Sequence, residues 1–307
     1  MTTSNVLTDL GGSSRQSLAT ARTHLDAALK GASTKDASAL AEDVGAGDLT
    51  AALIPETTTA TATVITREPT ILCGRSWFDE VFKQLDPKIS IEWNYMDGQR
   101  IAANKIICTL QGSARPLLTG ERTALNFLQT LSGTATDTRR YVDAIAGIGC
   151  KILDTRKTIP GLRRAQKYAV LCGGGTNHRI GLFDAILIKE NHIIAAGSIQ
   201  AAVSHARATA GERMVEIEVE NLQELEDALT TDIDRVLLDN FTNEQLTEAV
   251  KLKATCKTKV QLEASGNVTL ETIRDIARTG VDFISIGGLT KHLRAIDLSM
   301  RFQFSSP

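Results

Sequence analysis

The features that would place this chain in a membrane or outside the cell are missing from its 307 residues. No apolar run approaches the ~18 residues that a helix needs to span a bilayer. The polar start, residues 1–17, has no apolar centre, so we expect a mobile lead-in there rather than a secretory signal. Asp9 and Asp26 argue against a mitochondrial presequence. The sequence therefore predicts neither membrane insertion nor secretion.

Closely spaced cysteines are missing as well. The five cysteines are odd in number and scattered: Cys73, Cys108, Cys150, Cys172 and Cys256. This spacing offers no metal framework and is typical of a reducing compartment, so we expect a cytoplasmic location.

Strong net charge and several catalytic signatures are also absent. A formal net charge of -2 does not favour a nucleic-acid partner. The chain has no Gly-x-Ser-x-Gly elbow and no Cys-His pair, which disfavours acyl transfer through a covalent nucleophile. It has neither a Rossmann nor a Walker fingerprint. With 42% hydrophobic and 23% charged residues, it is typical of a globular protein with one large core or two domains.

Positive charge is nevertheless concentrated in the stretch from Asp154 to His192. Its basic residues are Arg156, Lys157, Arg163, Arg164, Lys167, His178, Arg179, Lys189 and His192. Gly173, Gly174 and Gly175 lie in the middle, where a backbone without Cβ atoms can approach a ligand closely. This pattern indicates a site for a small polyanion.

The first third of the chain shows short strand patterns between helices. We expect a helix from about Leu18 to Ala41 and another over Trp77–Leu85, begun by Ser76 with Asp79. The strand-like runs are Ala62–Ile65, Thr70–Cys73, Ile89–Tyr95 and Ile106–Leu110. The third of these runs alternates apolar with polar residues, which is typical of a half-buried strand. These elements predict an α+β domain with an antiparallel sheet.

A long helix is expected to begin at Pro116, with Leu118, Leu125 and Leu128 on one side. Arg122 lies on the flank of that side. It is either a solvated residue whose stem covers apolar surface or an arginine that reaches into a site or across a subunit boundary.

After Gly149 six apolar runs alternate with helical patterns. The runs are Lys151–Asp154, Asp184–Lys189, Val215–Val219, Val236–Asp239, Val260–Glu263 and Phe283–Ile286. The helical patterns are Gln200–Thr209, Leu222–Leu229, Asn243–Leu252 and Leu270–Arg278. This alternation predicts a parallel sheet, either a barrel or an open doubly wound sheet. The final Leu293–Phe304 is expected to form a helix and a strand that return to the first domain.

The faces of the strands favour the barrel. Val215, Ile217 and Val219 alternate with glutamates at 216, 218 and 220. Because the outer face of a barrel strand packs on apolar helices, the glutamates should point inward. Gln261, Glu263 and Ser265 repeat the pattern. Buried carboxylates need counter-charges, which the segment 154–192 can supply. Glu216 and Glu263, deeper in the strands, could alternatively be salt-bridge members alone.

The strand ends should bring together two kinds of charged group. The cations are Arg156, Lys157, His178, Arg179 and Lys189, and the acids are Glu218 and Asp239. This combination suits a polyanionic substrate with Mg²⁺, which takes one or two carboxylates and otherwise keeps waters and phosphates. Two turns that follow strands, Ser265-Gly266-Asn267 and Gly287-Gly288, could hold phosphate through backbone N–H groups.

Specific motifs occur at Gly120–Phe127, Asp154–Gly161, Lys167–Val170, Gly173–Arg179, Ile188–His192, Leu237–Asn240, Glu263–Gly266 and Gly287–Thr290. Through these motifs the sequence, from about Ala41 to Phe302, resembles the quinolinate phosphoribosyltransferases, most closely the bacterial type. The chain departs little from the family pattern: Gly288 stands where many members carry Ala, and Ala264 is at a variable position.

The resemblance implies an enzyme of NAD biosynthesis. With Mg²⁺, it would transfer the phosphoribosyl group of phosphoribosyl pyrophosphate to quinolinate, giving nicotinate mononucleotide, pyrophosphate and CO₂. The implied fold is an N-terminal α/β sandwich domain, residues 1–131, on which 291–307 pack, followed by an incomplete seven-stranded α/β barrel of TIM type, residues 132–290. The implied assembly is a homodimer with shared active sites, although the sequence does not separate a dimer from a hexamer.

The resemblance also implies roles for individual residues. Arg122 would come from the neighbouring subunit, and Arg156, His178, Arg179 and Lys189 would hold the quinolinate carboxylates. Lys157, Lys189, Glu218 and Asp239 would be catalytic and would meet phosphoribosyl pyrophosphate, with the two acids also binding Mg²⁺, partly through water. The 5′-phosphate would lie on Ser265, Gly266, Asn267, Gly287 and Gly288. Glu220 has the same parity as Glu218; the motif favours Glu218 for the ribose.

Two other functions remain open at this stage. The acceptor could be another base, such as nicotinate or a non-pyridine, because the cation cluster favours a dicarboxylate only weakly. The protein could also be a binder of phosphosugars or pyridine acids without catalysis, because a fold alone does not establish an activity.

Overall fold

The computed structural model describes residues 32–256 and 259–305 and divides the chain into two compact units. The first contains Met1–Arg139, Ile159–Gly174 and His292–Pro307, and the second contains Arg140–Thr158 and Gly175–Lys291. The expectations for residues 1–17 and for most of the first helix lie outside the described residues. The division after residue 131, expected from the sequence, stays a prediction.

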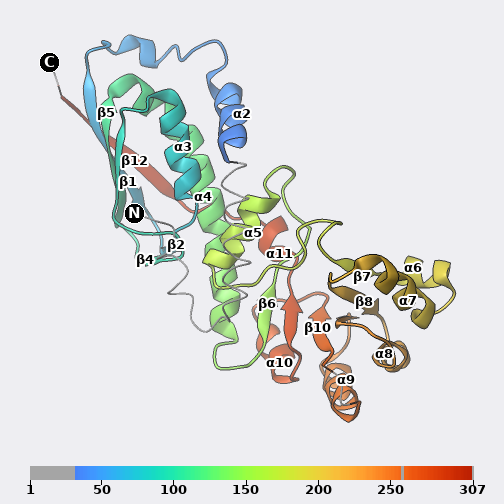
Figure 1. Ribbon diagram of the computed structural model, residues 1–307. Coiled ribbons are helices and arrows are strands. Elements are labelled where there is room, and N and C mark those ends of the chain that lie inside the picture. Colours follow the sequence, from blue (N-terminus) through green and yellow to red (C-terminus); the bar gives the residue numbers. More distant parts are fainter. Residues whose placement is uncertain (1–31, 257–258, 306–307) are drawn as a thin grey trace. The chain divides into compact units, whose positions relative to one another are not determined.

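An antiparallel sheet of four strands forms the first unit, in the order β12-β1-β5-β3. Its elements are α2 (Ala32–Val44), a 3-10 turn η1 (Ala51–Leu53), β1 (Thr59–Thr66), β2 (Thr70–Ile71), α3 (Arg75–Leu85), β3 (Ser90–Trp93), β4 (Arg100–Ile101), β5 (Ile106–Ser113), α4 (Ala114–Ala144, whose end enters the second unit), α5 (Arg163–Cys172) and β12 (Leu298–Ser305). Helices α3 and α4 lie along one face of this sheet (Figure 1). The predicted antiparallel sheet is confirmed.

The pattern of β1 shows why this sheet forms. The β-branched residues threonine, valine and isoleucine, which are stiff at χ1 and pack well in strands, make up most of Thr59–Thr66, and every second side chain is buried. Ala60, Ala62 and Val64 face a core that also contains Trp77 and Phe82 from α3. Small residues in the strand leave space for these aromatic rings of the helix.

Two local predictions for the first unit need correction. Helix α3 begins after Gly74 in the left-handed region, not at Ser76, and the Asp79 carboxylate accepts the indole N–H of Trp93 at 2.8 Å. Residues between α11 and β12 form no helix. Two cysteines that are far apart in the sequence lie close together in space: the sulfurs of Cys73 and Cys172 lie within 4.8 Å of each other and of the Asp97 carboxylate.

Parallel strands alternate with helices in the second unit, as predicted. The strand order is β6-β11-β10-β9-β8-β7. The elements are β6 (Lys151–Leu153), β7 (Ile186–Ile188), α6 (Glu190–Ala196), α7 (Ile199–Ala210), β8 (Val215–Val219), α8 (Leu222–Leu229), β9 (Arg235–Asp239), α9 (Asn243–Thr255), β10 (Gln261–Ser265), α10 (Ile273–Arg278), β11 (Phe283–Ser285) and α11 (Gly288–Lys291). Helices α7 to α10 flank the strands on their outer side (Figure 1).

A seventh parallel position lies beside β6. Thr176 forms a parallel bridge with Leu153, and its N–H donates to the carbonyl of Ile152 at 2.8 Å. Six strands and this bridge give the second unit a partial barrel, in agreement with the expected fold.

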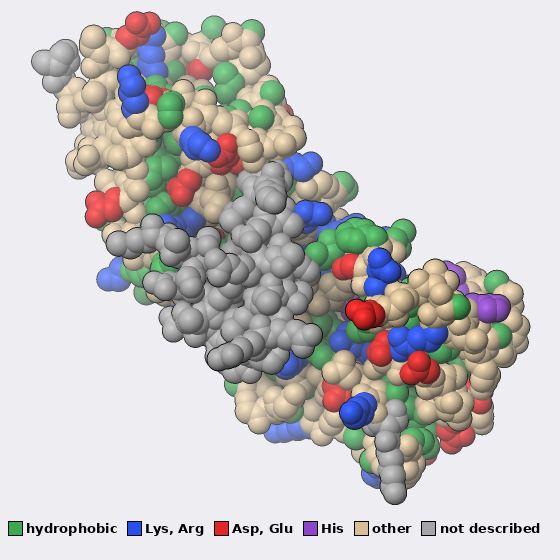
Figure 2. Space-filling model, in the orientation of Figure 1, with side chains coloured by type: hydrophobic (Ala, Val, Ile, Leu, Met, Phe, Trp, Pro, Cys, Tyr) green, Lys and Arg blue, Asp and Glu red, His purple; other side chains and the backbone are tan. Residues whose placement is uncertain are grey.

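Within residues 32–256 and 259–305, no helix combines the length and apolarity required to cross a membrane. On the face shown in Figure 2, basic and acidic side chains are intermixed, in keeping with the formal net charge of -2.

Gly133→Ala should lower the melting temperature, because a Cβ at this position would lie 2.2 Å from the backbone oxygen of Arg294. Helix propensity alone would favour alanine by about 1 kcal/mol, whereas overpacking costs about 1–3 kcal/mol. We expect the clash to exceed the propensity gain, since a backbone atom cannot rotate away. Thermal unfolding followed by circular dichroism measures the difference.

Gly149→Ala is the matched control, because a Cβ there would meet nothing within 4 Å. Its melting temperature should stay within about 1–2 °C of the native value. An unchanged or higher melting temperature for Gly133→Ala would show that residues 292–297 move easily away from α4.

Candidate active site

Four charged side chains gather at the carboxyl ends of the strands in the second unit. Glu218 and Asp239 come from the ends of the adjacent strands β8 and β9, and Lys189 directly follows β7. The Lys189 amino group forms an ion pair with Glu218. Burial and the nearby Glu218 raise the pKa of Asp239, while Lys189 and Lys157 oppose this rise. The sequence predicts a quartet of site residues: Lys157, Lys189, Glu218 and Asp239. These four side chains lie close enough for the other three to act on the pKa of Asp239.

Glycines let the backbone approach this quartet. A Cβ on Gly287 would lie 2.9 Å from Cδ of Lys157, so the lysine stem packs directly on the glycine backbone. The Thr290 hydroxyl also donates to the Lys157 carbonyl at 2.7 Å. Gly266 has a φ of +111°, and its Cβ would collide with Oδ1 of Asn240 at 2.2 Å. Both turns thus expose backbone beside the charged groups.

Arg156 and Arg179 form a second cationic group. Burial and the neighbouring Arg156 lower the pKa of Arg179, against the opposing influence of Glu216 and Asp184. Nη1 of Arg179 donates to the carbonyl of Ala185 at 3.2 Å. Both side chains are half-buried. Two guanidinium groups in this proximity favour a ligand with more than one negative charge.

The Asp154 and Asp184 carboxylates fix the loop that carries Arg179. Asp154 accepts the N–H of His178 at 2.9 Å and the amide of Asn177 at 2.6 Å. Asp184 accepts the backbone N–H groups of Ile180 and Gly181 at 2.7 and 2.9 Å. These bonds explain why acidic residues occur within the basic segment.

His178 is placed differently from the other predicted site residues. Its ring is buried, and Nε2 lies 2.8 Å from Oε2 of Glu216. Nδ1 accepts the N–H of Arg179 at 2.7 Å. Because Nδ1 accepts a hydrogen bond, the ring proton belongs on Nε2. Both ring nitrogens thus have partners inside the protein.

Two glutamates line the interior of the sheet, as the strand parity predicted. Glu216 and Glu263 are fully buried, and both have raised pKa values. Burial and the neighbouring Glu216 raise the pKa of Glu263 to about 7. Nε2 of His178 lies 3.6 Å from Oε2 of Glu263, so the two acids share one imidazole.

Arg235 supplies a counter-charge that the sequence reasoning missed. Its Nη1 lies 3.3 Å from Oε2 of Glu263, and its side chain is buried. The sequence predicts counter-charges only from residues 154–192, and it predicts a fourth strand that begins one residue later, at Val236. The same alternation could have found it, since Arg235, Leu237 and Asp239 share one parity of β9.

The remaining predicted residues come from the carboxyl end of β10 and the segment after β8 in the second unit, and from α4 in the first unit. Ser265 ends β10, and Asn267 lies in the turn that follows and adopts the left-handed conformation. Glu220 is exposed beyond β8, and its N–H donates to Glu224. Arg122 is exposed on α4 of the first unit. Geometry within the second unit therefore distinguishes Glu218, which pairs with Lys189, from Glu220.

Oxygen donors for a metal are present among the described residues. Glu218 and Asp239 offer carboxylates close enough for the charge of one to raise the pKa of the other. Hard oxygen donors with room for further ligands suit Mg²⁺. His178, Glu216 and Glu263 also place one donor atom each within 4.8 Å of one another.

Two family models match the chain and together span most of it. Residues 48–132 match the quinolinate phosphoribosyl transferase N-terminal domain, and residues 134–301 match the C-terminal domain of the same family.

Individual relatives and solved structures agree with the family models. A probable carboxylating nicotinate-nucleotide pyrophosphorylase of Synechocystis is 41% identical over 85% of this chain and 89% of its own length. The enzyme of that name from Mycobacterium leprae is 41% identical over 85% of this chain and 94% of its own. The nicotinate-nucleotide pyrophosphorylase structure from Francisella tularensis has a TM-score of 0.87 and 52% identity, covering 90% of this chain and 97% of that one. The chain belongs to the quinolinate phosphoribosyltransferase family.

Proposed function

We propose that this protein transfers the phosphoribosyl group of phosphoribosyl pyrophosphate to quinolinate and releases pyrophosphate and CO₂. The product would be nicotinate mononucleotide, an intermediate of NAD biosynthesis. The observation that carries the proposal is that the second unit contains two charged groups. One is the guanidinium pair Arg156 and Arg179, and the other is the quartet Lys157, Lys189, Glu218 and Asp239. The names of the relatives support it.

The guanidinium pair is suited to the acceptor. Quinolinate carries two adjacent carboxylates, and each matches the planar donor fork of an arginine. We assign Arg156, Arg179 and Lys189 to these carboxylates. His178 would contribute by fixing Arg179, because both of its ring nitrogens are already engaged. The partial burial of Arg179 strengthens the attraction, since water screens it less.

The acid–lysine quartet is suited to the donor. Lys157 and Lys189 would face the pyrophosphate, and Glu218 and Asp239 the ribose hydroxyls. The turns at Ser265–Asn267 and Gly287–Gly288 would hold the 5′-phosphate through backbone N–H groups. The same two acids would hold Mg²⁺, partly through water, and the bound ion would neutralise charge on the leaving pyrophosphate. Placing a cation there also relieves the repulsion that raises the pKa of Asp239.

The bond changes need little proton transfer. The anomeric C–O bond breaks toward pyrophosphate while the pyridine nitrogen forms the new C–N bond. The developing positive charge on ribose lies near Glu218 and Asp239, and the negative charge lies near the lysines. The adjacent carboxylate then leaves as CO₂, and its electron pair stays on a ring carbon stabilised by the neighbouring ring cation before it takes a proton. Preorganised charge would therefore provide most of the rate enhancement.

We further propose that the protein works as a cytoplasmic homodimer in which Arg122 completes the neighbour's site. The exposure of Arg122 on α4 supports this, because the side chain is available to a second subunit. The cysteines, none in a disulfide within the described residues, are in keeping with a reducing compartment.

Release of CO₂ from quinolinate tests the proposed reaction. With quinolinate labelled at the carboxylate on C2, phosphoribosyl pyrophosphate and Mg²⁺, we expect labelled CO₂ and nicotinate mononucleotide in equal amounts. Nicotinate in place of quinolinate should give no product, since it lacks the second carboxylate. Turnover of nicotinate alone would identify a different acceptor, and binding of quinolinate without turnover would leave a binding protein.

Arg156→Ala and Arg179→Ala should each raise the KM for quinolinate by about one to two orders of magnitude, because each removes a charged hydrogen-bond donor. The KM for phosphoribosyl pyrophosphate should change about twofold or less. Arg278→Ala, which removes an exposed arginine paired with Asp275, is the control and should alter neither value. Equal increases for both substrates would contradict the assignment of the guanidinium pair.

A mixture of inactive Arg122→Ala and inactive Asp239→Ala proteins should regain activity if subunits exchange. Random exchange makes half of the dimers mixed, each with one intact site, so about a quarter of the native activity should return. A mixture of Asp239→Ala with Glu218→Ala should stay inactive, since each subunit of a mixed dimer then has a lesion in its own second unit. Exchange is confirmed by co-purification of two differently tagged copies. If tagged copies exchange and the first mixture stays inactive, Arg122 does not act across subunits.

A further inference from the structure

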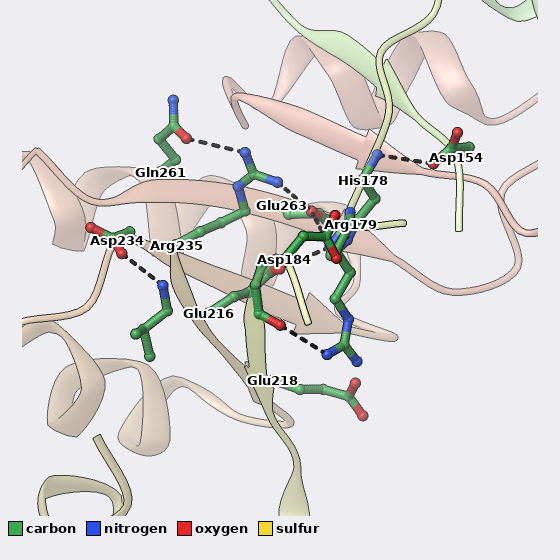
Figure 3. A network of polar contacts seen from close by, with 12 residues as sticks. Asp154, His178, Arg179, Asp184, Glu216, Glu218, Asp234, Arg235, Gln261 and Glu263 are labelled. Carbon is green, nitrogen blue, oxygen red and sulfur yellow. Dashed lines mark hydrogen bonds and ion pairs between the residues drawn. The ribbon is translucent and has the colours of Figure 1, made fainter. Parts of the chain in front are cut away.

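Arg235 is an unusual residue for the interior of a parallel sheet. It begins β9, the strand that Asp239 ends, and its side chain is 8% exposed. The guanidinium donates to Glu263 at 3.3 Å and to the side-chain oxygen of Gln261 at 3.2 Å. It also lies over the ring of Phe283 at 4.1 Å from the centroid. Figure 3 shows it held between Gln261 and Glu263. Two hydrogen bonds and a ring contact thus hold one positive charge in place, whereas the buried Nε of Arg235 has no hydrogen-bond partner among the described residues.

A short series of contacts connects this charge to the candidate site. Arg235 contacts Glu263, whose Oε2 lies 3.6 Å from Nε2 of His178. The other ring nitrogen of His178 accepts the backbone N–H of Arg179 at 2.7 Å. The position of Arg179 therefore depends on an imidazole whose Nδ1 carries no proton.

Arg235 determines whether that tautomer is stable. Glu216 and Glu263 are two buried acids beside one imidazole. Without a cation next to Glu263, the pair would draw a second proton onto His178, since an imidazolium compensates buried negative charge. A proton on Nδ1 would point at the N–H of Arg179 and break that hydrogen bond.

His178, Glu216 and Glu263 have the donor types to hold a metal ion, since their donor atoms lie within 4.8 Å of one another. The guanidinium of Arg235 argues against this interpretation. It already occupies the Oε2 side of Glu263 with a permanent positive charge. A divalent cation would add two more charges beside it in a water-poor interior, which is unfavourable.

We propose that Arg235 is a positioning residue for the acceptor site. It neutralises Glu263, keeps His178 in the Nε2-protonated form and so holds Arg179 in place for a substrate carboxylate. The assignment of the carboxylate to Arg179 rests on the proposed function, whereas the effect on the histidine does not.

Arg235→Met tests the proposal, because methionine keeps the length and apolar stem and removes the charge. We expect the KM for quinolinate to rise about tenfold or more, with the KM for phosphoribosyl pyrophosphate within about twofold of native. Arg235→Lys should recover part of the loss. Adding Glu263→Gln to Arg235→Met removes both charges and should restore quinolinate affinity. If the single variant unfolds, the double variant should still fold.

Arg207→Met is the matched control, since Arg207 pairs with Asp232 and Asp234 on the outside of the same unit. It should lower the melting temperature without changing either KM. A purely structural role for Arg235 would give the same result as this control. An unchanged quinolinate KM in Arg235→Met, or a double variant no better than the single one, would overturn the proposal.

A measurement without substrate separates this proposal from the proposed function. In ¹⁵N-histidine-labelled native protein, the ring signals of His178 should show a neutral imidazole protonated on Nε2. They are assigned by replacing the other four histidines one at a time. Arg235→Met should convert them to an imidazolium pattern, and the double variant should not. An unchanged pattern in Arg235→Met would refute the proposal even in an active enzyme. A stoichiometric metal that elemental analysis finds in the native protein and not in Glu263→Gln would refute it as well. A native protein with the expected pattern but no CO₂ release would instead refute the proposed function alone.

Discussion

Two carboxylates buried inside a parallel sheet impose the constraint on which the rest of the second unit depends. A sheet of this kind usually fills its interior with branched apolar side chains, but here Glu216 and Glu263 are fully buried. Their charge requires partners, and the partners come from His178 on one side and Arg235 on another. Because His178 also accepts the N–H of Arg179, the compensation that stabilises the interior fixes a residue of the candidate site. Stability and ligand recognition share the same groups.

The order and type of the elements were largely predictable from the sequence. Alternation in β3 and β8 and the regular spacing of strands and helices after Gly149 are strong, local signals. Predictions failed where tertiary contacts decide the outcome. Ser76 resembles a helix cap, but in the structure the N-cap of α3 is Gly74 in a left-handed conformation. Cys73 and Cys172 are distant in sequence and close in space, because β2–α3 and α5 belong to one unit. Spacing along the chain carries no information about such pairs.

The candidate site was predictable to a similar extent. Strand parity and charge located Lys189, Glu218 and Asp239, and these residues lie together. The family resemblance gave their roles, which no composition or period could provide. The buried contacts of His178 and Arg235 were not predictable, because a sequence shows a charge but not whether it faces solvent or a buried partner. The assignment of His178 to the substrate carboxylates stays a prediction, and Arg235 lies one residue before the strand that the sequence predicts.

The pairing of β12 with β1 has a consequence for how the chain folds during its synthesis. β12 pairs with β1 over eight residues, from Thr59 with Ser305 to Thr66 with Leu298. β1 leaves the ribosome before the other strands, but it can pair with β12, its second neighbour after β5, only once residues 298–305 have been synthesised. Until then β1 presents an open edge, which invites wrong pairing with other chains. The second unit, whose strands lie between residues 151 and 285, can assemble during this interval, so the unit translated first is the one completed last.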